Sequence, residues 1–386
     1  MIQTFSSTIR RKEMDAVLTC MVDEKIGPGE LNARLIQTAK EFFSCAGAIA
    51  LRTPAAALKY ALKALNLEAG SAVMLSALAP LWQLTAVEEA GFKPLVLDVQ
   101  AESAQLTAEA VSEGIQKGGR ALVLRESLGI LPDFDGILAL GIPVIEDISQ
   151  SAGGFVPLAP QEGQAAAGSQ NAAQASAQAA PKGDSASGEG AQGEDAAKTE
   201  VAGKKAGSFG VYAICSLEEK DIITAGGGAL LMAAGRRDWP VLKSLAENIL
   251  SIEMLPDINA ALATVQIKEF ARNEARRKEL YALYNRSIMA GKNKGFVRDV
   301  DLNSTIWAYP LSLASGFKDV KAYAQKKEIE VRLAFEDSII AAKAEEFGAD
   351  CKNAKALALR TAVFPLYPRL GRTQVEKISK VLVTLP

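Results

Sequence analysis

The chain of 386 residues contains no histidine. This absence excludes Ser-His-Asp and Cys-His nucleophile systems, histidine-ligated zinc and any imidazole general base. Acid-base work near neutral pH must then be done by a lysine or carboxyl group of shifted pKa, by cysteine or tyrosine, or by a cofactor. Lysine suits this task because its pKa shifts readily when its amine loses contact with water.

Other absences narrow the class of protein further. The four cysteines have neither metal-type spacing nor the density of a disulfide scaffold. The 43 basic residues nearly balance the 45 acidic ones and form no block, so neither nucleic acid nor an anionic membrane surface is a predicted partner. No run of about 18 apolar residues predicts a membrane span, and the first residues lack the pattern of a signal peptide. We therefore expect a cytoplasmic protein.

What is present is a regular alternation of helical patterns and short apolar runs. Helical patterns occupy 53–65, 81–90, 107–116 and 134–139. Apolar runs that predict buried strands occupy 72–75, 94–98, 121–124, 143–145 and 207–214. This alternation indicates an α/β sheet buried on both faces. In such sheets, ligand-binding groups lie at the carboxyl ends of the strands.

A change of composition interrupts this pattern. Residues 161–200 include no Val, Ile, Leu, Met or aromatic residue, so this segment cannot bury enough apolar surface to offset its ordering entropy. We predict a disordered surface insertion, at about 157–205, inside a large domain of residues 1–250. A long helical pattern follows, and residues 251–386 are predicted to form a smaller α+β domain. Within that domain we interpret Trp307 as a packing residue.

Two residues at predicted strand ends point to a particular chemistry. Lys220 follows a strand and precedes the glycines of 226–228, which permit a tight turn. Asp147 ends the run PVIED at 143–147. We expect the two side chains to face one another across a single cleft at the carboxyl ends of the strands. An amine and a carboxylate so placed are the groups that pyridoxal 5'-phosphate (PLP) requires, one for its aldehyde and one for its ring nitrogen. On this evidence alone, a solvated loop charge is the commoner role for such a lysine.

The order of several motifs along the chain resembles the DegT/StrS family of sugar aminotransferases, within the PLP-dependent transferases of fold type I. The resemblance covers nearly the whole chain apart from the insertion. It includes the segments IGPG at 26–29, AALKYAL at 56–62, EAGFKP at 89–94, PVIED at 143–147 with Gln150, 220–229 and FPLYP at 364–368. It implies the aspartate aminotransferase fold, with a large, mostly parallel sheet domain and a smaller C-terminal α+β domain.

The resemblance also implies an activity. The family moves an amino group from an amino acid, typically glutamate, to a keto sugar attached to a nucleotide. Lys220 takes the place of the Schiff-base lysine, Asp147 that of the partner of the pyridine nitrogen, and Gln150 that of a cofactor-contacting glutamine. Because the family's active site forms between two subunits, a homodimer is expected, with the long helical region at about 255–284 as its interface.

Several positions depart from the family pattern. Thr53-Pro54-Ala55 replaces Ser-Gly-Thr at the phosphate-binding helix, and proline has no N–H to donate. Cys215, with Ser216 beside it, replaces a phosphate-contacting serine, and the stacking aromatic aligns with Pro80, two residues before Trp82. The predicted cofactor-binding residues are therefore Asp147, Gln150, Lys220, Thr53, Ala55, Cys215, Ser216 and Trp82. Two hypotheses remain: a PLP-dependent aminotransferase, or a degenerate, non-catalytic homodimer with weak or no PLP binding.

Overall fold

The computed structural model describes residues 1–157, 203–288, 293–296 and 304–386. Contacts divide the chain into two units, one of Met1–Phe155 with Lys205–Pro386 and one of Val156–Lys204. The segment 161–200, predicted to be disordered, lies outside the described residues. No helix in the described part of the chain is both long enough and apolar enough to cross a membrane.

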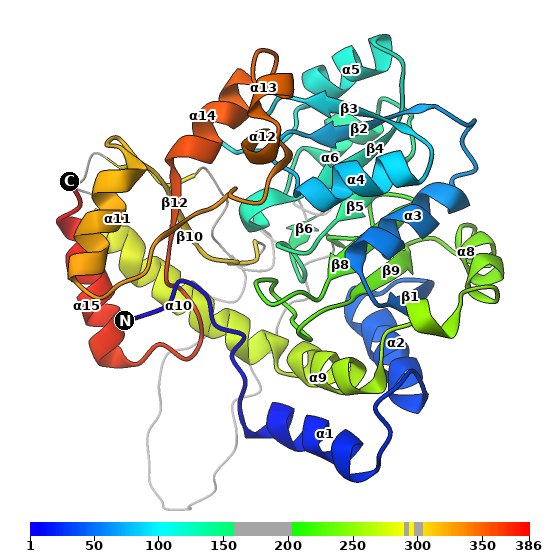
Figure 1. The fold of residues 1–386 in the computed structure, drawn as a ribbon, viewed down its shortest axis with the longest axis horizontal. Helices are drawn as coiled ribbons and strands as arrows, with labels where there is room; N and C mark the ends of the chain where they lie inside the picture. The colour runs from blue at the N-terminus through cyan, green and yellow to red at the C-terminus, as the bar shows by residue number, and fades with distance from the viewer. Residues whose placement is uncertain (158–202, 289–292, 297–303) are drawn as a thin grey trace, which may run out of the picture. The chain divides into compact units, whose positions relative to one another are not determined.

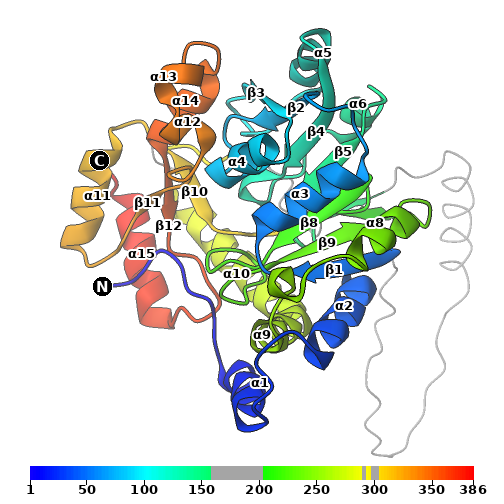
Figure 2. The ribbon, with the colours of Figure 1, turned by 45° about the vertical axis from the view of Figure 1, so that its right-hand side comes forward.

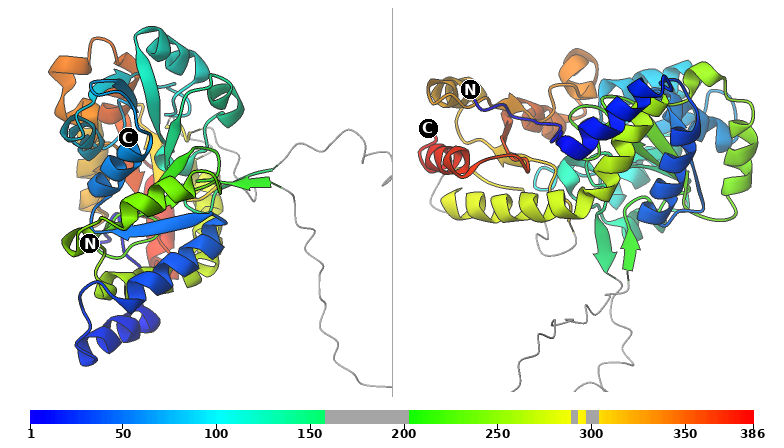
Figure 3. Two further views of the ribbon diagram at one scale, coloured as in Figure 1. Left: turned by 90° about the vertical axis from the view of Figure 1, so that its right-hand side faces the viewer. Right: turned by 90° about the horizontal axis from the view of Figure 1, so that it is seen from below.

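A seven-stranded sheet forms the centre of the first unit (Figure 1). The strand order is β1-β9-β8-β5-β4-β2-β3, and within this sheet β9 alone is antiparallel to its neighbours. Its strands are, in chain order, β1 (Gly47–Leu51), β2 (Ala72–Ser76), β3 (Lys93–Leu97), β4 (Gly119–Arg125), β5 (Val144–Asp147), β8 (Tyr212–Ser216) and β9 (Ala229–Ala233). The short strands β6 (Phe155–Pro157) and β7 (Gly203–Lys205) pair separately (Figure 3).

Helices follow most of these strands. The helices up to β5 are α1 (Arg11–Val22), α2 (Glu30–Phe43), α3 (Pro54–Ala64), α4 (Leu81–Glu89), α5 (Ala108–Gln116) and α6 (Phe134–Leu138). After β9 come α8 (Trp239–Ala246), α9 (Asp257–Lys268) and α10 (Phe270–Ile288). Two 3₁₀ helices, η1 and η2, cover Ser127–Gly129 and Ser251–Glu253. Because the β2-α4-β3 and β3-α5-β4 connections move in opposite directions along the sheet, right-handed crossovers place α4 and α5 on opposite faces.

Helix α3 shows why this part of the sequence folds as it does. The side chain of Thr53 accepts a hydrogen bond from Ala56 N at 3.1 Å and so caps the helix, while Pro54 occupies the first turn, where its missing N–H costs nothing. Ala57, Leu58, Ala61 and Leu62 recur at helical spacing and are buried against the sheet. The start of α3 is thereby fixed at the strand ends.

A second core surrounds a small sheet of order β10-β12-β11 (Figure 2). Side chains from α10, α11 and α15 pack with it. Its strands are antiparallel: β10 (Tyr309–Ser312), β11 (Arg332–Leu333) and β12 (Thr361–Phe364). The helices of this region are α11 (Phe317–Lys326), α12 (Ile339–Ala342), α13 (Ala344–Phe347), α14 (Lys352–Arg360) and α15 (Arg372–Val383).

The predicted fold class is confirmed: a large, mostly parallel sheet is followed by a smaller α+β part. The division at residue 250 stays a prediction, since both sheets belong to one contact unit in which α9 packs against α1 and α2. Strand β1 is missing from the sequence prediction, and β8 begins five residues after the predicted 207.

The late start of β8 has a local cause. The buried carboxylate of Glu146 accepts hydrogen bonds from the backbone N–H groups of Gly207 at 2.8 Å, Phe209 at 2.8 Å and Gly210 at 2.5 Å. Their amides are therefore not available to a strand ladder. Just before this turn, Ala206 N donates to Gly154 O at 2.9 Å, which joins the two sides of the insertion.

Candidate active site

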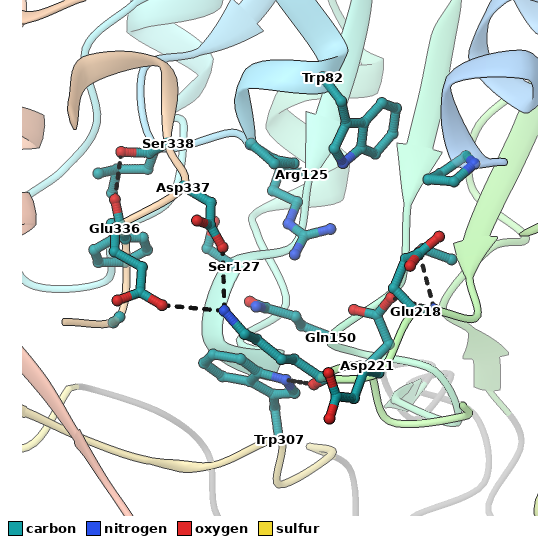
Figure 4. Close-up of a pocket in the computed structure, with 18 of the residues that line it drawn as sticks. Trp82, Arg125, Ser127, Gln150, Glu218, Asp221, Trp307, Glu336, Asp337 and Ser338 are labelled. Carbon is teal, nitrogen blue, oxygen red and sulfur yellow. Dashed lines mark hydrogen bonds and ion pairs between the residues drawn. The ribbon is translucent and has the colours of Figure 1, made fainter. Parts of the chain in front are cut away.

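A cavity of about 570 Å³ lies where strands of the large sheet end (Figure 4). This volume is in the range of small-molecule sites. Its wall includes Arg125 at the end of β4, Ser216 at the end of β8 and Pro54 at the start of α3. Further side chains come from the loop at 333–338, far away in the sequence. The position matches the rule that open α/β sheets bind ligands at the carboxyl ends of their strands.

Lys220 lies on the wall of this cavity, in the turn that follows β8. Its side chain is 35% exposed, and its Nζ is 3.0 Å from Glu336 Oε1 and 3.3 Å from Asp337 Oδ2. The indole Nε1 of Trp307 donates a hydrogen bond to the carbonyl oxygen of Lys220 at 2.8 Å. The backbone of the lysine is thus held in place while its amine contacts the acidic loop at 336–337.

The turn after Lys220 requires glycine. Gly226, Gly227 and Gly228 all have positive φ angles, of 73°, 146° and 107°. A Cβ on Gly228 would lie 2.3 Å from Leu255 Cδ1, so a larger residue would have to displace this buried leucine. The positive φ angles, which glycine adopts without strain, account for the predicted tight turn.

The acidic loop opposite Lys220 is held by backbone hydrogen bonds to the start of α4. Leu81 N donates to Asp337 O at 2.9 Å, and Ile339 N donates to Ala79 O at 2.8 Å. Glu336 is shared between two cations, because its Oε1 lies near Lys220 and is also 2.7 Å from Arg332 Nη2. The two carboxylates therefore reach Lys220 from a loop that is anchored to the large sheet's helices.

Asp147 is completely buried and does not line the cavity. Its Oδ2 accepts hydrogen bonds from Arg125 Nη1 at 2.6 Å and from Gln83 Nε2 at 2.6 Å. Its Oδ1 accepts from the backbone N–H of Ser149 at 3.1 Å and from that residue's hydroxyl at 2.5 Å. Arg125, which is 9% exposed, stands at the cavity wall in its place. The predicted meeting of Lys220 and Asp147 across one cleft is therefore indirect, because a guanidinium intervenes.

Five other predicted cofactor-binding residues do line the cavity: Thr53, Ala55, Trp82, Gln150 and Ser216. The side-chain oxygen Oε1 of Gln150 accepts a hydrogen bond from Leu128 N at 2.7 Å, which fixes that side chain. Cys215 does not line the cavity. It is fully buried in β8, its Sγ is 3.8 Å from Ser216 O, and burial raises the pKa of its thiol well above the ordinary value.

Acidic side chains also line the cavity next to Ser216. Glu218 is exposed, and its backbone N–H donates to Asp221 Oδ2 at 3.1 Å. Burial raises the pKa of Asp221 to about 7 from an ordinary value of 3.8. Below that pH this part of the wall loses a negative charge, which favours an anionic ligand.

Arg125 and Trp307 were not among the predicted site residues. Arg125 ends an apolar run, which reads as an ordinary strand terminus, and its partner is set by the register that places it opposite Asp147 in the β4-β5 pair. The interpretation of Trp307 as a packing residue of the C-terminal domain is incomplete, because its ring also lines the cavity. The one available signal for Arg125 was a charged residue at the end of the apolar run 121–124.

A lysine amine and a buried carboxylate beside one cavity fit the aldehyde and ring nitrogen of PLP. The fold is that of the PLP-dependent transferases of fold type I. A sequence model of the DegT/DnrJ/EryC1/StrS aminotransferase family matches residues 7–182 and 184–383, and the chain belongs to this family. Aminotransferases of this family use PLP as their cofactor.

Solved structures share the same fold at low sequence identity. The aminotransferase TlmJ from Streptoalloteichus hindustanus is 16% identical, with 99% of this chain and 98% of that chain covered and a TM-score of 0.79. The putative sugar aminotransferase Spr1654 from Streptococcus pneumoniae, in its PLP-form, is 14% identical, with 98% and 97% covered and a TM-score of 0.78. The sugar aminotransferase CalS13 from Micromonospora echinospora is 14% identical, with 100% of both chains covered and a TM-score of 0.76.

Proposed function

We propose that this chain transfers an amino group from an amino acid, glutamate being the family's usual donor, to a keto sugar carried on a nucleotide. The observation that supports this proposal most directly is the position of Lys220, which lines the cavity and precedes a turn of three glycines. When bound, PLP supplies the aldehyde that takes up the amino group and the ring that accepts electrons.

The residues of this chain would then have separate tasks. Lys220 would link the cofactor and later move the proton at the donor's Cα, a task for which the sequence offers no histidine. Asp147 would hold the ring nitrogen once Arg125 has left it. Trp82 and Gln150 would border the ring, and Thr53, Ala55 and Ser216 would meet the phosphate.

Lys220 must first leave its acidic partners. Its contacts to Glu336 and Asp337 are partly exposed, with 31% and 75% of those side chains accessible. Ion pairs of this kind contribute only about 0–1 kcal/mol, so the amine changes partners at little cost.

Reduction with borohydride tests the proposed role of Lys220. Protein incubated with saturating PLP should turn yellow and lose that colour on reduction, and peptide mapping should find the cofactor attached to Lys220. Amino transfer should then be measured by mass spectrometry with glutamate and a panel of nucleotide-linked keto sugars. Cofactor attached elsewhere, or no attachment at all, would contradict the proposal.

A second candidate is a non-catalytic member of the family with weak or no PLP binding. The ion pair between Arg125 and Asp147 favours it, as does Pro54, which offers no N–H to a phosphate. In that case Lys220 stays unlabelled at any PLP concentration, and no amino transfer is detected with any sugar.

We further propose that two copies assemble into a homodimer. The outer face of α1 exposes Met14, Leu18 and Met21, at 51%, 54% and 56%, and Ile252 is 72% exposed. Exposed apolar residues at helical spacing are typical of a surface that is covered by a partner. The predicted interface at 255–284 is less suitable, since α9 packs on α1 and α2 and α10 packs on α15. Light scattering at micromolar concentration should give twice the chain's mass.

A further inference from the structure

Asp147 has no hydrogen-bonding position left for a ligand. A carboxylate offers about four acceptor positions. Arg125 and Gln83 use Oδ2, and the backbone and hydroxyl of Ser149 use Oδ1. A ring N–H that is to bind this carboxylate must therefore displace a donor that is already there.

Of these donors, Arg125 is the one that faces the cavity. It lines the wall, whereas Gln83 is fully buried and Asp147 itself is hidden behind the guanidinium. The pairing is built into the sheet, because Arg125 lies directly opposite Asp147 in the register of β4 and β5. The guanidinium carries the same charge as a protonated pyridine, and it is the donor to Asp147 that borders the cavity.

We propose that Arg125 competes with the ring nitrogen of PLP for Asp147 and is thereby a determinant of cofactor affinity in this chain. The inference rests on the proposed function, since it assumes that PLP enters this cavity. Replacing one cation on Asp147 by another changes the number of charges and hydrogen bonds very little. The contact between the ring nitrogen and Asp147 therefore adds little net affinity for PLP. In a site whose carboxylate has no partner before binding, the same contact would add more.

Affinity measurements with two ligands test this competition. Binding of PLP, and of its 1-deaza analogue, which has carbon in place of the ring nitrogen, is followed by fluorescence quenching of Trp82 and Trp307 at the cavity wall. Arg125→Ala should tighten PLP by about tenfold or more, the effect of one freed charged contact. The same variant should leave the affinity for 1-deaza-PLP nearly unchanged. Arg125→Lys, which keeps the charge, should remain close to wild type.

A second pair of variants keeps the test valid if Arg125→Ala fails to fold. Arg125→Met keeps most of the side-chain volume without the charge and should also tighten PLP. Gln83→Leu removes a donor from the same Oδ2 without opening the cavity and should not. PLP should also raise the melting temperature of Arg125→Met more than that of wild type, because the cofactor restores a partner to Asp147.

The outcomes separate this inference from the proposed function. If wild type is labelled at Lys220 but neither Arg125 variant binds PLP more tightly, the competition is refuted and the function stands. Equal tightening of PLP and 1-deaza-PLP would mean that Arg125 only fills space, which also refutes it. If no protein, wild type or variant, binds PLP or is labelled, the proposed function fails and the competition fails with it.

Discussion

At Asp147 a carboxylate with no exposed surface is held by four hydrogen bonds, one from a guanidinium on the neighbouring strand. At Lys220 a partly exposed amine is shared between two carboxylates of a loop. The first arrangement is set by strand register and is costly to alter. The second depends on surface contacts that exchange easily. The cavity therefore has a rigid side, formed by the buried contacts of Asp147, and an adaptable side, formed by the partly exposed contacts of Lys220. The chemistry proposed for this site requires Lys220 to be on the adaptable side, because its amine must leave its partners.

Lys220→Ala should show that the adaptable side is needed for activity but not for folding. We expect amino transfer to fall by about a thousandfold or more, since the variant loses both the amine that would link the cofactor and the base that would move the proton. The free energy of unfolding in urea should change by less than about 1 kcal/mol. Lys59→Ala is a matched control, because its 2.8 Å ion pair with Glu89 is also exposed but lies outside the cavity. Activity that survives in Lys220→Ala would remove the basis of the proposed function.

Asp147→Asn should lower the stability of the fold as well as the activity. It leaves Arg125 buried without its anionic partner, which costs about 3–5 kcal/mol in the free energy of unfolding. Gln83→Leu, which removes one neutral donor from the same carboxylate, should cost about 1–3 kcal/mol. We also expect Asp147→Asn to bind some cofactor but to react very slowly. An unfolding curve like that of wild type would show that Arg125 finds another partner and that this side is not rigid.

Asp221→Asn should reveal the charge on the cavity wall through the pH dependence of its melting temperature. The pKa of this carboxyl is raised to about 7 in the folded protein, from an ordinary value of 3.8. The folded state therefore binds the proton of Asp221 more tightly than the unfolded state does. The stability that this proton gives the folded state is lost as pH rises from about 4 to 7. The variant's melting temperature should exceed that of wild type more at pH 8 than at pH 4. Glu219→Gln, at an exposed position in the same turn, should show no such trend.

The double variant Glu336→Gln with Asp337→Asn removes both partners of Lys220. Because these contacts are partly exposed, unfolding in urea should change by no more than about 1 kcal/mol. Borohydride labelling of Lys220 with PLP should become faster, as the amine no longer has to leave an ion pair. A loss of stability as large as that of Asp147→Asn would abolish the distinction between the two sides.

The smallest effect is expected from deletion of residues 161–200. The segment includes no Val, Ile, Leu, Met or aromatic residue, so its removal should forfeit no apolar burial and leave the melting temperature nearly unchanged. Cofactor labelling of Lys220 should also persist. A fall of many degrees would mean that the segment packs on the rest of the chain.

The elements that were predictable from the sequence are those with strong local patterns. Continuous apolar runs gave β2 to β5, and helical spacing with a Thr-Pro start gave α3. Strand β1, with the sequence GAIAL, was missed because a short, fully buried run next to an alanine-rich helix has no period of its own. β8 was placed too early because the N–H groups of its first predicted residues bind Glu146, a partner that lies far away in the sequence.

The site divides in the same way. Lys220 and Asp147 stand next to recognisable glycines and strand ends, and five of their predicted companions line the cavity. Arg125 could not be predicted, because its role depends on which strand lies beside β4 and in what register. Trp307 depends on a hydrogen bond to a residue 87 positions away. Contacts of this kind become visible only when the sheet is assembled.

The hydrogen bonds of Glu146 bear on whether other sequences can replace the insertion. Its three backbone hydrogen bonds, with the bond from Ala206 to Gly154, close the protein on both sides of the insertion before the chain reaches β8 and Lys220. These bonds join residues outside the segment 161–200, so they do not depend on its length or composition. We therefore expect this position to be a splice point, at which an affinity tag, a reporter domain or a binding module can be exchanged for the native segment.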